Sequence, residues 1–221
     1  MRDLLLIGAG GIARETADAV GAINAVHPTW NLLGYLDDDL AKQGTIVSGL
    51  PVLGPIDAVG EHPDAAVVLC TVRPDNYVSR KAIAGRLELD EARYATIVHP
   101  SATIGASSIV GAGSVLLAHV DVTVDVVIGC HVMVMPQVVL PHDVRVDDYV
   151  TIASGVRVGG GTHLAECAYI GASATIRQDL SVGERALVGM AAVVTRDVPS
   201  ERMWFGTPAR DMGPAPLSAL R

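Results

Sequence analysis

The most constraining feature of this sequence is a period of six residues. From Val98 to Val194 every sixth residue is Val, Ile or Leu, without an insertion. The residue four positions after each of these is almost always small or aliphatic. A fixed short period of this kind predicts a parallel β-helix built of hexapeptide repeats.

The period also predicts where side chains point. Strand alternation directs the two patterned positions inward and the residue between them outward, and the other three residues turn a corner. Three hexads form one triangular coil, so residues eighteen apart stack along one edge or face. Glycine opens many of the corners, such as Gly105, Gly129 and Gly159, and we expect unusual φ angles there.

The composition agrees with a narrow interior and argues against several classes of protein. Half of the 221 residues are hydrophobic but only 4% are aromatic, as expected where Val, Ile, Leu and Ala fill a β-helix. The formal net charge of −8 argues against a nucleic-acid partner. Neither a membrane-spanning apolar run nor a signal peptide is apparent, so we expect a cytoplasmic protein. The three widely spaced cysteines match no metal-binding spacing, and we expect reduced thiols.

The first part of the chain follows a different pattern, which predicts a small Rossmann-like α/β domain. Apolar runs at 4–7, 31–36 and 65–70 are predicted strands, and helices are expected after the first and the third. We therefore expect a nucleotide- or sugar-binding domain at 1–95, the β-helix at 96–200 and a C-terminal tail at 201–221.

The first predicted strand ends in a glycine turn that could hold a phosphate. Gly8, Gly10 and Ala13 match a dinucleotide fingerprint, in which backbone N–H groups meet a phosphate at the start of a helix. Asp37, after the second strand, could accept a hydrogen bond from a ribose hydroxyl. The domain is short for a complete dinucleotide fold, so a nucleotide or nucleotide-sugar is favoured over NAD. A turn that serves only the fold is the alternative.

The register of the repeat places His119, His131 and His142 on three different edges of the prism. One chain therefore cannot gather them around a metal, whereas a trimer could. A metal-dependent hydratase like the β-helical carbonic anhydrases is thus an alternative function. His99 and His163 are expected to be structural or solvated.

His142 differs from the other histidines in its neighbours. Asp143 follows it at the same corner, where a carboxylate can orient the imidazole and stabilise its protonated form. One coil further along this edge, Gly159, Gly160 and Gly161 predict open space beside His142. A base beside a cleared groove suits acyl transfer, because the attacking hydroxyl or amine must lose a proton. A surface His–Asp pair without a catalytic role is the alternative.

Six motifs occur in order along nearly the whole chain: Gly8-Ala9-Gly10-Gly11, Tyr35-Leu36-Asp37-Asp38-Asp39, His99-Pro100-Ser101-Ala102, Pro141-His142-Asp143, Gly159-Gly160-Gly161 and Gly206-Thr207-Pro208-Ala209-Arg210. Together they resemble the bacterial hexapeptide-repeat sugar acetyltransferases, which include sialic-acid O-acetyltransferases and UDP-4-amino-sugar N-acetyltransferases. The resemblance implies a left-handed β-helix and transfer of acetyl from acetyl-CoA, as co-substrate, to a sugar or nucleotide-sugar. It implies no metal.

The resemblance also implies a role for each matching residue. His142 matches the general base and Asp143 its acidic helper. The positions that match acetyl-CoA contacts are Thr151, Gly160, Ala172 and Met190, with Thr151 in place of a histidine found in some members. The positions that match nucleotide-sugar contacts are Gly10, Gly11, Ile12, Asp37 and Asp38. Arg73 lies in a loop that departs from the family pattern and could meet a phosphate.

An apolar row on one face of the prism predicts a homotrimer. The outward positions of this face are Val115, Met133, Thr151, Tyr169 and Leu187, and exposed apolar rows often mark interfaces. The family's homotrimer would place acetyl-CoA between neighbouring β-helices and bring the acceptor to His142 from another subunit's N-terminal domain. A non-catalytic nucleotide-binding scaffold that only oligomerises is a third hypothesis. Trp204 and Phe205 are expected to cover the end of the last coil.

Overall fold

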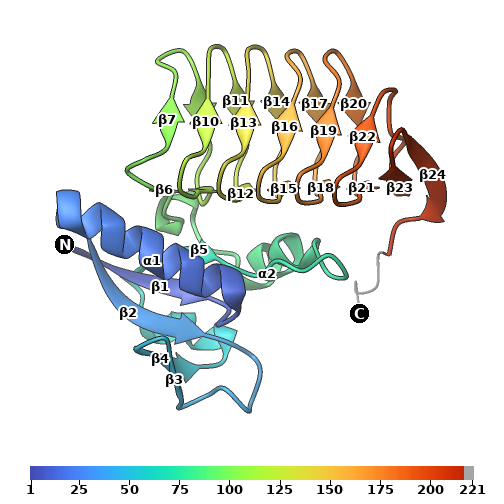
Figure 1. Ribbon diagram of the computed structural model, residues 1–221. Coiled ribbons are helices and arrows are strands. Elements are labelled where there is room, and N and C mark those ends of the chain that lie inside the picture. The colour runs from blue at the N-terminus through green and yellow to red at the C-terminus, as the bar shows by residue number, and fades with distance from the viewer. Residues whose placement is uncertain (217–221) are drawn as a thin grey trace.

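The computed structural model describes residues 1–216, and its N-terminal unit is built on a five-stranded sheet (Figure 1). The strand order is β3-β4-β2-β1-β5, with β1 parallel to β2 and β5 and with β3 and β4 forming an antiparallel hairpin. The hairpin is not apparent from the sequence, because both strands are short and β4 contains Pro51. The elements are β1 (Arg2–Ile7), β2 (Trp30–Leu36), β3 (Ile46–Val47), β4 (Leu50–Gly54), β5 (Ala66–Leu69) and the 3₁₀ helices η1 (Ile56–Glu61) and η2 (Glu91–Arg93).

Two helices cover the two faces of this sheet. α1 (Gly11–Val26) packs on the face that carries Leu4 and Leu6, and α2 (Ser79–Leu87) packs on the face that carries Leu5 and Ile7. Successive side chains of a strand point to opposite faces, which explains why this whole apolar run is buried. No helix within residues 1–216 has the length and apolar character that crossing a membrane requires.

The repeat folds as a left-handed parallel β-helix, and the predicted fold class is confirmed. Three sheets form the faces of a prism, and each strand pairs with the strands eighteen residues away, as Met133 does with Val115 and Thr151. The first face contains β6 (Ile97–Val98), β9 (Val115–Leu116), β12 (Met133–Val134), β15 (Thr151–Ile152), β18 (Tyr169–Ile170) and β21 (Leu187–Val188). The second face contains β7 (Thr103–Ile104), β10 (Asp121–Val122), β13 (Val139–Leu140), β16 (Arg157–Val158), β19 (Thr175–Ile176) and β22 (Val193–Val194). The third face contains β8 (Ile109–Val110), β11 (Val127–Ile128), β14 (Arg145–Val146), β17 (His163–Leu164) and β20 (Ser181–Val182).

The interior of the prism contains the positions that the period selects. These side chains form one buried cluster that runs from Leu116 to Val198 and ends on Trp204 and Ala209. Fully burying one Val, Leu or Ile stabilises a fold by about 1.5–3 kcal/mol, so repeated aliphatic residues supply this core almost without aromatic rings.

The glycines that open the corners are required for space rather than for backbone conformation. A Cβ built on Gly105, Gly129 or Gly159 would lie closer than 3.0 Å to an atom of the next coil. Positive φ angles fall two residues later, at the last residue of the corner, which is usually not glycine. Asp143, with φ 60°, is one of these residues. The expectation of unusual φ angles at the opening glycines is therefore wrong.

The apolar row on the first face packs against the N-terminal domain of the same chain. Val115 and Met133 join the core cluster of α1 and the sheet, and Tyr169 and Leu187 pack beside Tyr77. Figure 1 shows α1 and α2 lying along this face of the prism. The prediction that this row joins the subunits of a trimer is therefore wrong, because the row is already covered within the chain.

The C-terminal segment continues the first face past the last coil. β23 (Arg202–Gly206) pairs in parallel with β21 and turns back as β24 (Ala209–Pro214). Trp204 is buried in the core cluster of the prism, and the ring of Phe205 lies against Gly189. Both side chains thus cover the end of the last coil, as predicted. Residues 217–221 of the predicted tail lie outside the described residues.

Candidate functional site

His142 and Asp143 form a hydrogen-bonded pair at the corner between the second and third faces. The imidazole Nδ1 lies 2.9 Å from Asp143 Oδ2, and the two side chains are 65% and 66% exposed. A carboxylate can only accept here, so Nδ1 carries the proton in the neutral ring and Nε2 keeps its lone pair. The pair therefore presents an oriented imidazole with a free basic nitrogen to the surface.

The glycines one coil along this edge do not leave open space, because the imidazole itself fills it. A Cβ on Gly160 would lie closer than 3.0 Å to two atoms of the His142 ring and 3.0 Å from a third. The φ angle of Gly160 lies outside the left-handed region, so its missing side chain serves only this close approach. The space that the sequence predicts to be an open groove is therefore occupied by the imidazole, which packs against the backbone of Gly160.

The other histidines have different surroundings. His131 is only 7% exposed and lies between two rings, stacked on Tyr149 at 5.0 Å and edge-on to Tyr94 at 4.5 Å. Burial, followed by the charge of Arg80, lowers the pKa of His131 to about 4. Such an enclosed ring cannot be a metal ligand shared between subunits, which removes the basis of the predicted hydratase alternative. No group of three or more possible metal ligands occurs within residues 1–216.

A second His–Asp pair lies on the third face. His163 Nε2 is 2.7 Å from Asp147 Oδ2, but the other oxygen of this carboxylate accepts from Arg145 Nε at 3.0 Å. The charge of Asp147 is therefore shared with a permanent cation. His163 is part of a surface ion-pair network, whereas within residues 1–216 the Asp143 carboxylate pairs with His142 alone.

The N-terminal domain contains a cavity of about 430 Å³ at the carboxyl ends of β1, β2 and β5. It is lined by all six residues predicted to meet a nucleotide-sugar: Gly10, Gly11, Ile12, Asp37, Asp38 and Arg73. A Cβ on Gly10 would meet no atom within 4 Å, so glycine there leaves open space. α1 begins at this point with no side-chain cap and no acidic residue in its first turn. The uncapped N–H groups and the open space together suit an anionic group such as a phosphate.

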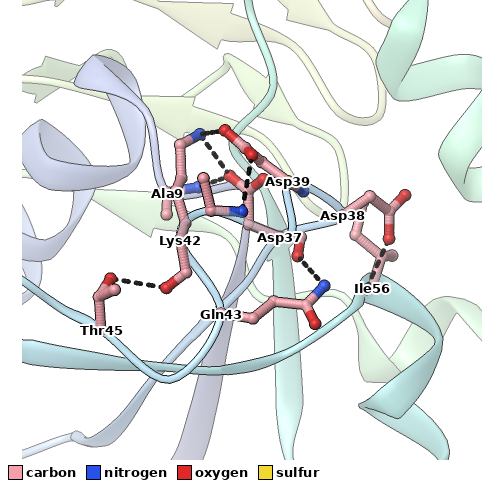
Figure 2. A network of polar contacts seen from close by, with 9 residues as sticks. Ala9, Asp37, Asp38, Asp39, Lys42, Gln43, Thr45 and Ile56 are labelled. Carbon is pink, nitrogen blue, oxygen red and sulfur yellow. Dashed lines mark hydrogen bonds and ion pairs between the residues drawn. The ribbon is translucent and has the colours of Figure 1, made fainter.

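Asp37 holds the glycine turn in place. Its Oδ2 accepts from the Ala9 amide at 2.7 Å and from Lys42 Nζ at 3.0 Å, and its Oδ1 accepts from the Asp39 amide at 2.9 Å (Figure 2). Burial by itself would raise the pKa of Asp37, but the hydrogen bonds from Asp39, Lys42 and Ala9 outweigh it and the pKa is lowered. Three bonds leave about one acceptor position for a ligand hydroxyl. Asp37 is therefore both a support of the turn and a possible ribose contact.

The remaining charged residues of the cavity are also paired. Asp38 accepts from the Ile56 amide at 2.9 Å and from Arg86 Nη2 at 3.0 Å. Arg73 is bidentate to Asp75, with distances of 2.9 and 2.8 Å, so a phosphate would have to compete for its guanidinium. Lys42 lines the cavity but was not predicted, because no motif marks it and only the folded loop brings it to Asp37.

The four positions predicted to meet acetyl-CoA are separated by the fold. Ala172 and Met190 are exposed on the edge between the first and second faces, and Gly160 lies under His142 on the edge between the second and third. Thr151 is fully buried, and its hydroxyl accepts from Arg80 Nη2 at 2.9 Å. Thr151 therefore holds the domains together, and its prediction as an acetyl-CoA contact is wrong.

The basic pair and the cavity lie on opposite sides of the molecule. In a triangular prism the corner that carries His142 faces away from the first face, and the first face is the one that packs on the N-terminal domain. A ligand in the cavity of one chain therefore cannot reach the His142 of that chain.

Comparison with known proteins gives similarities to both domains. Residues 125–160 match the family described as bacterial transferase hexapeptide (six repeats). Over 123 residues the chain is 31% identical to UDP-N-acetylbacillosamine N-acetyltransferase of Bacillus subtilis, a match that covers 53% of this chain and 52% of that protein. The chain spans no more than about half of the length of the curated relatives that it matches.

Two solved structures resemble nearly the whole chain. The acetyltransferase domain of PglB from Neisseria gonorrhoeae is 29% identical, with a TM-score of 0.85 and coverage of 96% of this chain and 100% of that one. A mutant form of perosamine N-acetyltransferase from Caulobacter crescentus is 22% identical and shares the fold, with a TM-score of 0.84 and coverage of 96% and 98%.

Proposed function

We propose that this chain belongs to the bacterial hexapeptide-repeat sugar acetyltransferases and transfers an acetyl group from acetyl-CoA to an amino group of a nucleotide-linked sugar. The observation that carries the proposal is the exposed His142–Asp143 pair, in which Asp143 fixes Nδ1 and leaves Nε2 free as a base. An amino acceptor is favoured over a hydroxyl, because two relatives that act on sugars, UDP-N-acetylbacillosamine N-acetyltransferase and perosamine N-acetyltransferase, are N-acetyltransferases.

The transfer is a direct attack in which His142 moves one proton. Nε2 takes a proton from the acceptor amine as the nitrogen attacks the thioester carbonyl carbon, and Asp143 stabilises the imidazolium that forms. When the tetrahedral intermediate collapses, the C–S bond breaks and the proton passes from Nε2 to the CoA sulfur. No covalent intermediate is needed, because the amine itself attacks the thioester. Burial raises the pKa of the Cys70, Cys130 and Cys167 thiols, which disfavours the thiolate that a cysteine nucleophile requires.

The nucleotide of the acceptor binds in the cavity of the N-terminal domain. The amides at Gly10, Gly11 and Ile12 hold a phosphate at the start of α1, and Asp37 and Asp38 contact the nucleoside. Arg73 adds a phosphate contact after it exchanges Asp75 for the ligand. Support comes from a neighbour of the same fold, whose structure contains GDP-perosamine and CoA.

Acetyl-CoA binds between the β-helices of neighbouring subunits in a homotrimer. Ala172 and Met190 are exposed on one edge of this groove, and the His142 ring, which covers Gly160, lies on another. The pyrophosphate and adenosine extend along the groove. Acetyl coenzyme A is present in a structure of the PglB acetyltransferase domain, which is 29% identical to this chain.

A second copy of the chain completes the proposed site, because one chain keeps its cavity and its base apart. With the first face already covered, the contact falls on exposed apolar residues beside His142: Ile109 and Val127 on the third face, and Val124 one coil before His142 on the same edge. The N-terminal domain of one subunit then presents the sugar amine to the His142 of the next.

The proposal is tested with acetyl-CoA and a panel of UDP-, GDP-, dTDP- and CMP-linked 4-amino sugars. We expect release of CoA thiol and acetylation of the sugar, detected by mass, with at least one nucleotide-linked amino sugar. Absence of transfer to every member of the panel would contradict the proposal. Sedimentation equilibrium tests the trimer, and a fully active monomer would refute the shared site.

A further inference from the structure

Arg80 on α2 is a fully buried arginine at the junction of the two domains. Its Nε donates to His131 O at 3.1 Å, and its Nη2 donates to Tyr149 O at 2.7 Å and to the Thr151 hydroxyl at 2.9 Å. Its Nη1 donates to Thr71 O at 3.2 Å. These acceptors are neutral oxygens, so the buried charge is stabilised by carbonyl and hydroxyl dipoles rather than by a carboxylate.

Such an arrangement costs free energy unless every partner stays in place. A buried charge is tolerated only when it is paired or fully hydrogen-bonded, and removing part of its shell is strongly destabilising. Burial lowers the pKa of Arg80 to about 10, so the side chain remains charged at neutral pH. The position of each carbonyl relative to the guanidinium is therefore tightly constrained.

The carbonyls belong to two different parts of the molecule. Thr71 O is in the wall of the nucleotide cavity, and Ser79 Oγ also reaches Thr71 Oγ1 at 3.0 Å, which closes the segment 71–79 into a loop. The other acceptors belong to the corner and first face of the β-helix. Tyr77, inside the same loop, donates its hydroxyl to Arg185 O of the β-helix at 2.9 Å. One wall of the cavity is thus fixed directly to the prism.

We propose that Arg80 is a positioning residue that holds the wall of the nucleotide cavity on the β-helix, so that the sugar amine arrives at a fixed place for the base of the neighbouring subunit. This inference rests on the proposed acetyl transfer. Arg80 touches neither substrate nor His142, so its effect must depend on the acceptor being held through its nucleotide.

The test compares Arg80→Lys on two acceptors, the nucleotide-linked amino sugar and the methyl glycoside of the same sugar. We expect kcat to fall about 100-fold for the nucleotide-linked acceptor, since misplacement by about 1 Å can cost this much. We expect a change below about twofold for the methyl glycoside and for the KM of acetyl-CoA. Guanidinium ion added to Arg80→Ala should restore part of the lost rate. Equal loss on both acceptors, or loss on neither, would overturn the inference.

Arg93→Lys is the matched control. Arg93 also donates to two carbonyls, Ala65 O at 2.7 Å and His62 O at 3.0 Å, but both lie within the N-terminal domain. We expect this variant to keep the selectivity of the unmodified enzyme between the two acceptors. A loss like that of Arg80→Lys would mean that any arginine–carbonyl contact has this effect, and would overturn a specific role for Arg80.

A second measurement needs no variant and no turnover. Hydrogen exchange of the unmodified protein is followed with and without UDP and GDP. Binding should slow exchange in 71–79 and also at 149–151, across the domain junction. It should not slow exchange at the corners between the second and third faces, which lie away from the N-terminal domain. Protection confined to 71–79 would overturn the link even if acetyl transfer is established. Absence of transfer by the unmodified enzyme would instead contradict the proposed function.

Discussion

The β-helix and the α/β domain position the residues of the candidate site in opposite ways. In the β-helix the position of a side chain follows from its residue number, because strands pair in a constant eighteen-residue register. In the α/β domain the cavity depends on contacts between separate segments, such as Asp37 with Ala9 and Lys42. The comparison teaches that a repeat determines where a group lies, whereas an irregular fold must hold each group with its own bonds.

The largest effect is expected for His142, the proposed base, which the register places at its corner and Asp143 orients. His142→Ala should lower acetyl transfer about 1,000-fold, since general-base catalysis contributes roughly 10²–10⁴. The affinity for acetyl-CoA, measured by calorimetry, should not change. His163→Ala removes the other His–Asp pair of the β-helix and should leave the rate nearly unchanged. If both variants lose the same activity, the distinction between the two His–Asp pairs is wrong.

His131, which lies where the two domains meet, predicts that the free energy of unfolding depends on pH. The pKa of His131 is about 4 in the folded protein and 6.5 when unfolded. The unfolded chain therefore takes up a proton first as pH falls, and stability is lost between about pH 6.5 and pH 4, by up to about 3 kcal/mol. His131→Asn, which cannot titrate and tolerates the left-handed backbone, should reduce this slope in denaturant titrations. An unchanged slope would show that His131 is not the group responsible.

Substitution of Gly160 tests how closely the His142 imidazole must pack against the backbone of the next coil. Gly160→Ala would place a Cβ against the His142 ring and displace it, so transfer should fall by about 100-fold. Gly21→Ala, in α1 where a Cβ meets no atom within 4 Å, is the control and should keep full activity. A crystal structure of Gly160→Ala with an unmoved imidazole and normal turnover would contradict the prediction.

The smallest effect is expected in the α/β half, where glycine leaves space for a ligand rather than for the protein. Gly10→Ala adds a Cβ that meets no atom within 4 Å, so the free energy of unfolding should hardly change. The melting temperature should therefore stay within about 2 °C of that of the unmodified protein. The KM of the nucleotide-linked acceptor should rise about tenfold, or about 1.4 kcal/mol. An unaltered KM would show that the phosphate does not approach Gly10.

The same contrast explains what could be predicted from the sequence. The six-residue period predicts the prism, the edges that carry His119, His131 and His142, and the His142–Asp143 corner, because all of these depend only on counting. It could not predict the cover of the first face. The row from Val115 to Leu187 would be apolar whether a partner subunit or a neighbouring domain covered it. Only the packing of α1 and α2 decides between the two.

In the α/β domain the motif located the cavity but not the task of each side chain. Asp37 lines the predicted cavity, yet its first task is to hold the Ala9 amide. Arg80 and Lys42 were not predicted, because an arginine in a helix and a lysine in a loop carry no local sign of a distant carbonyl or carboxylate. The resemblance assigns Thr151 to acetyl-CoA, and the repeat gives no sign that another domain buries this residue.

The unbroken register also limits how an enzyme of this kind can change. Strands of a sheet lie about 4.8 Å apart, so inserting one coil between the docked coils and His142 would move the base along the prism by that amount. An insertion of six or twelve residues would carry the base to another edge of the prism, and any insertion that is not a multiple of six would break the alternation and turn core residues outward. The separation of the two half-sites can therefore change only in discrete steps, and adaptation to a longer or shorter acceptor must take place in the loops of the α/β domain.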